Sequence, residues 1–331
     1  MSTMWQKDMW LFSKKLVKVV VISCTIIILT RYGWQISFPV FQADPSLRAI
    51  SQRLEQTVKD LSETIGIRNF NYGTLDSSAQ YIGESFEDLG YMVEKWPYQV
   101  EGVTFSNLVA KLKNNDSEEY ILIGAHYDSC FNPGADDNAS GIAGLLELAR
   151  SLKKEALKTN IMFVAFANEE PPFFQTGRMG SRVFVRDLQT KNILVKSAIV
   201  FEMIGFYSDK LFSQAYLPLL GPFYPNQGNF IAVVGSFQSQ ALVCAIEKNF
   251  KKVTSFPMSS VITPSMIPGL NFSDHASFWD VGIPAVMVTD TAYLRNPNYH
   301  QDSDRVNTLN FIKMAAVVEG FRKVIINISN Q

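Results

Sequence analysis

The chain has 331 residues, of which 47% are hydrophobic and 18% are charged. This composition supports a large buried core and is not that of a long disordered chain. Thirty Lys and Arg residues balance 31 Asp and Glu residues, which gives a formal net charge of −1. We therefore expect no nucleic-acid partner, because such a partner needs a basic face on the protein.

The first 31 residues differ from the rest of the chain. Lys14, Lys15 and Lys18 precede an apolar run over residues 19–29, and Arg31 follows it. A basic start before a short apolar stretch is typical of a signal peptide. The run is shorter than the roughly 20 residues that span a bilayer, and a membrane-attached signal-anchor over residues 16–30 is the alternative. In both cases we expect an exported protein that works in the periplasm or outside the cell.

Three cysteines, Cys24, Cys130 and Cys244, are too few for a disulfide framework. One bridge at most is open to them, between Cys130 and Cys244. No pair of cysteines has the CxxC spacing, which excludes a zinc site built from paired thiolates.

Residues 32–44 are predicted to connect the first segment to a domain that begins at Pro45. Apolar residues at steps of three and four predict a helix over 45–65, and a second helix is predicted over 75–89. Extended stretches follow at 91–100 and 107–112.

The apolar run at 120–125 predicts a strand that is buried on both faces of a sheet. Strands and helices alternate from there to the end of the chain, which predicts an α/β sheet with helices on both faces. No break divides residues 45–331, so we predict one domain. The further predicted strands are 160–167, 198–204, 230–234 and 285–289, and the further predicted helices are 140–153, 178–188, 238–250 and 306–326.

Acidic residues and histidines follow the predicted interior strands, or lie in polar loops that can reach the carboxyl ends of these strands. The carboxyl ends of strands are where open α/β sheets bind ligands. Carboxylates gathered at such a place must either take up protons or bind a cation. The residues are His126, Asp128, Asp136, Asp137, Glu169, Glu170, Glu202, His300 and Asp304.

A mixed set of imidazoles and carboxylates suits Zn²⁺, and also suits Mn²⁺ or Co²⁺. We expect five of these residues to bind metal, and five ligands are more than one tetrahedral zinc ion uses. Two ions that share a bridging carboxylate account for five ligands better. The five residues are His126, Asp137, Glu170, Glu202 and His300. The third histidine, His275, follows Asp274 in a segment rich in aromatic residues, and we expect it to support the site rather than to bind metal.

Six motifs in order along the chain carry a family resemblance. They are GAHYDS (124–129), GADDNASG (134–141), NEEPP (168–172), FEMIG (201–205), SDHASFWDVGIPA (273–285) and YHQDSD (299–304). Together they resemble the co-catalytic zinc exopeptidases, which include bacterial leucyl aminopeptidases, glutamate-carboxypeptidase-like enzymes and, more distantly, glutaminyl cyclases. The resemblance spans about residues 46–328. It implies a three-layer α/β/α sandwich with a mixed, mostly parallel central sheet, and a zinc exopeptidase catalytic domain over 45–331.

The resemblance also implies the metal ligands. His126 and Glu202 would bind one zinc ion. Glu170 and His300 would bind the other. Asp137 would bridge both ions, and it is preferred to its neighbour Asp136 because it stands directly before Asn-Ala-Ser-Gly.

The remaining roles follow from the same resemblance. Glu169 would be the general base that takes a proton from the attacking water. Asp128 would orient His126, and Tyr299 is a candidate donor to the oxyanion. The bond from Asp137 to Asn138 would be cis.

Two features depart from the family pattern. Relatives often have Asp where this chain has Glu202, and its longer side chain can change the metal spacing. The stretch from Pro171 to Met179 is an apolar insertion after the paired glutamates, which we expect to reshape the substrate pocket.

The leading hypothesis is therefore an aminopeptidase that acts on peptide substrates with two zinc ions. A glutaminyl-cyclase-like enzyme, which needs one zinc ion, is the second hypothesis. A carboxypeptidase and a binding domain without catalysis are further alternatives. The presence of Glu169 and of every ligand position argues against the last of these.

Overall fold

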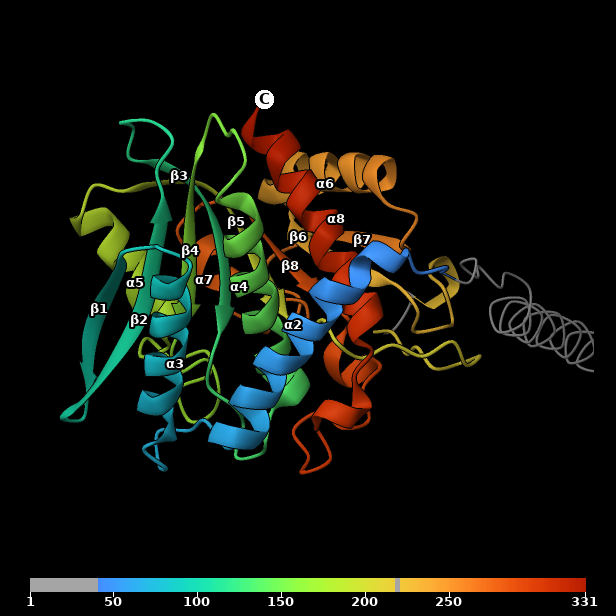
Figure 1. Cartoon of the computed structure of the whole chain (residues 1–331), viewed down its shortest axis with the longest axis horizontal. Helices are drawn as coiled ribbons and strands as arrows, with labels where there is room; N and C mark the ends of the chain where they lie inside the picture. The colour runs from blue at the N-terminus through green and yellow to red at the C-terminus, as the bar shows by residue number, and fades with distance from the viewer. Residues whose placement is uncertain (1–40, 218–220) are drawn as a thin grey trace, which may run out of the picture.

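The computed structural model describes residues 41–217 and 221–331, in which one eight-stranded sheet separates two layers of helices (Figure 1). The strand order is β1-β2-β4-β3-β5-β8-β6-β7. The strands are β1 (Val93–Val100), β2 (Val103–Leu112), β3 (Glu119–His126), β4 (Asn160–Phe166), β5 (Leu194–Glu202), β6 (Ile231–Ser236), β7 (Met258–Thr263) and β8 (Ala285–Thr289).

The sheet is mixed and mostly parallel, as predicted. Four pairs of neighbouring strands are parallel: β4–β3, β3–β5, β5–β8 and β6–β7. The pairs β1–β2, β2–β4 and β6–β8 are antiparallel. The parallel strands β4, β3 and β5 lie side by side in the middle of the sheet, so their carboxyl ends meet at one edge.

The central strands are apolar over most of their length because helices cover both of their faces. In β3, Ile121 and Ile123 face one core and Leu122 faces the other. This alternation follows from the two-residue period of a strand. The helices are α2 (Arg48–Lys59), α3 (Thr74–Asp88), α4 (Gly141–Leu152), α5 (Gly180–Thr190), α6 (Gln240–Val253), α7 (His275–Trp279) and α8 (Phe311–Ser329).

The two helical layers are unequal. Helices α2, α3, α4, α6 and α8 contribute to the larger core, and α5 and α7 contribute to the smaller core on the opposite face of the sheet. In Figure 1, α2, α4 and α8 lie in front of the sheet, and α5 and α7 lie behind it. The predicted three-layer α/β/α sandwich is therefore confirmed.

Several predicted elements needed correction. The last helix begins at Phe311 and not at residue 306, because the side chain of Asn310 caps it by accepting a hydrogen bond from the Lys313 amide. Strand β7 was not predicted, since its sequence MSSVIT alternates weakly and four of its six residues are only half-buried. Helix α7 was also missed, because five residues are too few to establish a helical period.

The signal peptide or signal-anchor that the sequence predicts at residues 1–31 lies outside the described residues, as does most of the predicted connector. Among the helices that the structure describes, none combines the length and the apolar character that crossing a membrane requires. Cys130 and Cys244 are both free thiols, so the bridge between them is not formed.

Candidate metal centre

The candidate ligands lie at the carboxyl edge of the central strands. His126 is the last residue of β3, and Glu202 is the last residue of β5. Glu170 follows β4 by four residues. Asp137 lies in the turn that leads into α4, and His300 lies in a loop between β8 and α8. Segments that are far apart in sequence therefore contribute to one small region.

Asp137 faces both histidines. Its Oδ1 lies 3.4 Å from Nε2 of His126, and its Oδ2 lies 3.2 Å from Nε2 of His300. On one side, Nε2 of His126 is also 3.2 Å from Oε2 of Glu202. On the other side, Nε2 of His300 is 3.4 Å from Oε2 of Glu170. The five residues thus form two neighbouring groups, and Asp137 belongs to both.

The charges of this region require a cation or protons. Burial opposes the charged form of His126, but the carboxylate of Glu202 and other acids outweigh burial and raise its pKa well above the usual value. Burial, the Asp137 carboxylate and other acids raise the pKa of Glu170 well above its usual value. Oε1 of Glu170 is buried and has no hydrogen-bond partner among the described residues. Imidazoles and carboxylates with a free buried oxygen form a donor set that fits zinc ions.

The turn that carries Asp137 is held by several backbone contacts. The Asp304 carboxylate accepts hydrogen bonds from the amides of Asp136 and Asp137, at 2.9 and 3.1 Å. The Asp137–Asn138 peptide bond is cis, as expected. Gly134 has φ +58°, and a Cβ there would lie 2.2 Å from the carbonyl oxygen of Asp137. The turn therefore requires glycine at this position.

Asp136 points away from the histidines. Its Oδ1 accepts a hydrogen bond from the Gly205 amide at 2.8 Å, and its Oδ2 accepts one from Nδ2 of Asn296 at 2.7 Å. The two neighbouring aspartates therefore have different structural roles. Asp136 connects the turn to two other loops through hydrogen bonds, and Asp137 faces the histidines.

Asp128 connects His126 to the paired glutamates. Its Oδ1 lies 3.4 Å from Nδ1 of His126. Its two oxygens also accept hydrogen bonds from the amides of Glu169 and Glu170, at 3.0 and 2.9 Å. Glu169 is buried, and burial, with Glu202 and Glu170 adding repulsion, raises the pKa of its carboxyl well above the usual value. A carboxyl with a raised pKa is suited to hold and pass a proton.

His275 does not face the candidate ligands. Its Nε2 lies 3.0 Å from the carbonyl oxygen of Leu270, and its ring packs edge-on against Trp279. Burial lowers the pKa of His275 to about 4, so the ring is neutral at physiological pH.

Four residues near the centre were given no role from the sequence. Ser273 donates a hydrogen bond of 2.7 Å to Oε2 of Glu202, and burial raises the pKa of Asp274 to about 7. Both belong to the SDH motif, which could have indicated them. Arg68 is fully buried beside the turn, and Cys130 lies beside Glu170 and His300. Neither has a sequence pattern that separates it from a surface charge or an ordinary thiol.

A family model described as "Peptidase family M28" matches residues 107–325 of the chain. These residues run from β2 into α8. The chain belongs to this family. It is therefore a metallo-exopeptidase by family, as the motifs indicated. The uncharacterized protein YfbL of Escherichia coli K12 is 42% identical over 290 residues, which are 84% of this chain and 88% of YfbL. A probable leucine aminopeptidase of Arthroderma otae is 29% identical over 294 residues, which are 81% of this chain and 71% of that protein.

Solved structures share the fold at lower identity. LapA of Legionella pneumophila aligns with a TM-score of 0.69 and 22% identity, over 90% of this chain and 79% of LapA. A glutaminyl cyclase of Bacteroides thetaiotaomicron aligns with a TM-score of 0.65 and 18% identity, over 87% of this chain and 99% of the cyclase. Both confirm the zinc exopeptidase-like architecture that the resemblance implied.

Proposed function

We propose that this M28 peptidase is an aminopeptidase that removes N-terminal residues from peptides with two zinc ions. The observation that carries the proposal is the position of Asp137, whose two oxygens face His126 and His300 in two adjoining groups. His126, Glu202 and Asp137 would hold one ion. Glu170, His300 and Asp137 would hold the other.

Bound zinc ions would supply Lewis-acid chemistry, since they lower the pKa of water and polarise a carbonyl group. Glu169 would take a proton from the attacking water and pass it to the leaving nitrogen. The buried surroundings of Glu169 support this role, because its raised pKa brings the carboxyl closer to the pKa of the groups with which it exchanges protons. Asp128 would hold both the His126 ring and the backbone of Glu169 in place.

An apolar pocket beside Glu202 and Tyr299 supports action at the N-terminal residue. Leu270, Phe272 and Met287 are among its lining residues. A peptide with its first side chain in this pocket would place its free amino group among the acidic ligands. Tyr299 stacks on His300, with ring centroids 3.7 Å apart, and its hydroxyl would donate to the oxyanion.

The insertion after the paired glutamates contacts this pocket. Phe174 packs edge-on against Phe272, which lines the pocket, with ring centroids 5.5 Å apart. Phe173 is buried against Phe70 and Phe105 and so anchors the insertion. We therefore expect a preference for apolar N-terminal residues.

Zinc content and hydrolysis test the proposal together. The purified full-length protein should contain two zinc ions per chain and should hydrolyse aminoacyl-nitroanilides, those with apolar residues fastest. Chelation should abolish the activity. A protein with two zinc ions that hydrolyses only peptides with a free C-terminus would instead be a carboxypeptidase.

The change Glu169→Gln should lower kcat by about 10² to 10⁴, the usual contribution of a positioned acid–base group. Zinc content should stay at the wild-type value, because Glu169 is not among the proposed ligands. The exposed residue Glu101 offers the control Glu101→Gln, which should leave both quantities unchanged. Undiminished hydrolysis by Glu169→Gln would show that another group is the base.

A glutaminyl-cyclase-like activity is the second candidate. Its support is that the chain shares its fold with the Bacteroides cyclase over 99% of the length of that protein. One zinc ion per chain, no hydrolysis of nitroanilides and cyclisation of glutaminyl peptides would establish that activity instead.

Export remains part of the proposal. The support for export is the basic and apolar pattern of residues 1–31. N-terminal sequencing of the mature protein distinguishes a signal peptide, which is removed, from an anchor at residues 16–30, which is retained.

A further inference from the structure

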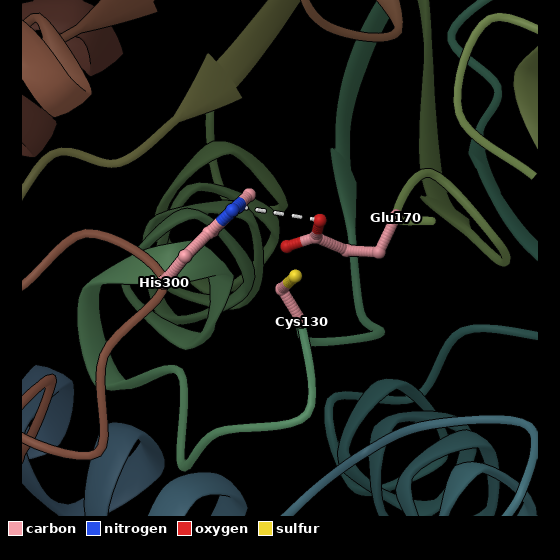
Figure 2. A group of neighbouring side chains, drawn as sticks. All are labelled: Cys130, Glu170 and His300. Atoms are coloured by element: carbon pink, nitrogen blue, oxygen red, sulfur yellow. Dashed lines mark ion pairs between the residues drawn. The ribbon is translucent and has the colours of Figure 1, made fainter. Parts of the chain in front are cut away.

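A thiol lies beside one half of the candidate metal centre. Cys130 occupies the loop between β3 and the turn that carries Asp137. Its Sγ, a carboxylate oxygen of Glu170 and a ring nitrogen of His300 all lie within 4.8 Å of one another. Figure 2 shows the three side chains converging from three separate segments of the chain.

A free buried oxygen marks the same place. Oε2 of Glu170 pairs with Nε2 of His300 at 3.4 Å, but Oε1 has no hydrogen-bond partner among the described residues. Only 3% of Glu170 is exposed, and its Oε1 is itself buried. A buried carboxylate oxygen without a partner is costly unless a cation or a proton meets it. The thiol, the free oxygen and the imidazole therefore share one site for a cation.

We propose that Cys130 is a direct ligand of the metal ion that Glu170 and His300 would hold. The inference rests on the metal centre of the proposed function. It adds a sulfur donor to a set that otherwise contains only nitrogen and oxygen. On binding, the thiol releases its proton to solvent and a bond forms between Sγ and the metal.

The sulfur donor changes the chemistry of one ion only. Asp137, Glu170, His300 and Cys130 would give that ion four protein donors, the number that tetrahedral zinc uses. The other ion would keep three, from His126, Asp137 and Glu202, and so retain a position for water. A thiolate also favours Zn²⁺ over a harder ion such as Mn²⁺. The two halves of the centre would then differ in metal preference.

Cobalt substitution of the full-length protein tests the inference without an activity assay. A thiolate on Co²⁺ gives sulfur-to-metal charge-transfer absorption in the near ultraviolet, whereas imidazole and carboxylate ligands do not. The wild-type protein should show this band. The variant Cys130→Ser should lose it and should bind the second zinc ion at least roughly tenfold more weakly, the lower end of what loss of a supporting residue costs.

The other two cysteines provide matched controls. Cys244 is exposed on α6, and both Cys244→Ser and Cys24→Ser should keep the band. Cys130→Ala should behave as Cys130→Ser does, which separates loss of the thiol from any effect of the new hydroxyl. Should neither variant fold, the presence or absence of the band in wild-type protein and in the two control variants decides.

The two proposals fail in different ways. Two bound cobalt ions with visible d–d absorption but no charge-transfer band would overturn the role of Cys130 and leave the metal centre intact. A protein that binds no cobalt or zinc would overturn the metal centre, and the ligand role of Cys130 with it.

Discussion

Arg68 is fully buried next to the turn that carries Asp137, and its guanidinium donates to backbone carbonyl groups. Its guanidinium hydrogen-bonds five carbonyl oxygens. Three of them, from Tyr127, Pro133 and Gly134, flank the loop that contains Cys130. Burial lowers the pKa of Arg68 to about 10, although nearby acids such as Asp304 oppose the shift, so the side chain stays charged at neutral pH.

Among the described residues, no carboxylate pairs directly with Arg68, but its positive charge lies near acids of the candidate metal centre. Asp304, Asp128 and Asp137 all stabilise its charged form. The same residue thus shapes the loop through its hydrogen bonds and offsets part of the repulsion among the candidate ligands.

The change Arg68→Met should lower the free energy of unfolding of the metal-free protein by about 3–5 kcal/mol, because it leaves several buried carbonyl oxygens unpaired. Urea unfolding measures the loss. The control is Arg178→Met, which removes an exposed ion pair with Glu101 and should cost at most about 1 kcal/mol. Equal losses in the two variants would mean that the buried contacts of Arg68 contribute no more than a surface pair.

At the scale of elements, α8 holds the larger helical layer against the sheet. Phe321 of α8 is fully buried and packs between the ring of Phe201 on β5 and the ring of Phe250 on α6. The two centroid distances are 5.4 and 5.5 Å. Since β5 ends in Glu202, this packing also positions one candidate ligand.

The change Phe321→Ala should lower the free energy of unfolding by about 3–5 kcal/mol, because a large cavity replaces the ring. Thermal or chemical unfolding checks it, with Lys323→Ala as the control on the same helix. The Lys323 side chain is 42% exposed, and its loss removes an ion pair with Glu319 that should cost at most about 1 kcal/mol. A small effect of Phe321→Ala would show that α8 can collapse onto the vacated space.

At the scale of the whole molecule, buried titratable groups link stability to pH. Burial raises the pKa of Asp274 from 3.8 to about 7 and that of Asp290 from 3.8 to about 6. A raised carboxyl pKa means that the folded state binds more protons than the unfolded state in this window. These groups therefore make the metal-free protein less stable as pH rises from 3.8 to about 7. His275, with its lowered pKa, acts in the opposite direction between about 4 and 6.5.

Bound zinc should reverse this dependence, because its ligands must lose their protons before they bind. The stabilisation by zinc, about 2.7 kcal/mol at a free concentration 100 times the Kd, should therefore grow as pH rises. We expect the gap in Tm between zinc-loaded and chelated protein to widen from about pH 5 to about pH 7, with the chelated protein losing stability over that range. A gap that stays constant over this range would contradict competition between protons and metal. Differential scanning calorimetry measures both forms.

Much of this architecture follows from local patterns in the sequence. The apolar run of β3 predicts a strand covered on both faces, and the helical steps of α3 predict its length to within a residue or two. Because His126 and Glu170 follow predicted interior strands, the sequence predicted that both would lie at the carboxyl edge of the sheet. The choice of Asp137 over Asp136 came from the family motif and not from any pattern of charge.

The tertiary structure alone decided how distant segments meet. Local periodicity reports which face of an element is apolar, but it does not report which element covers that face, since this depends on the packing of the whole chain. Arg68 resembles a surface charge in sequence and is fully buried. Cys130 resembles an ordinary thiol, and only the approach of the loops that carry Glu170 and His300 gives it two metal-binding neighbours.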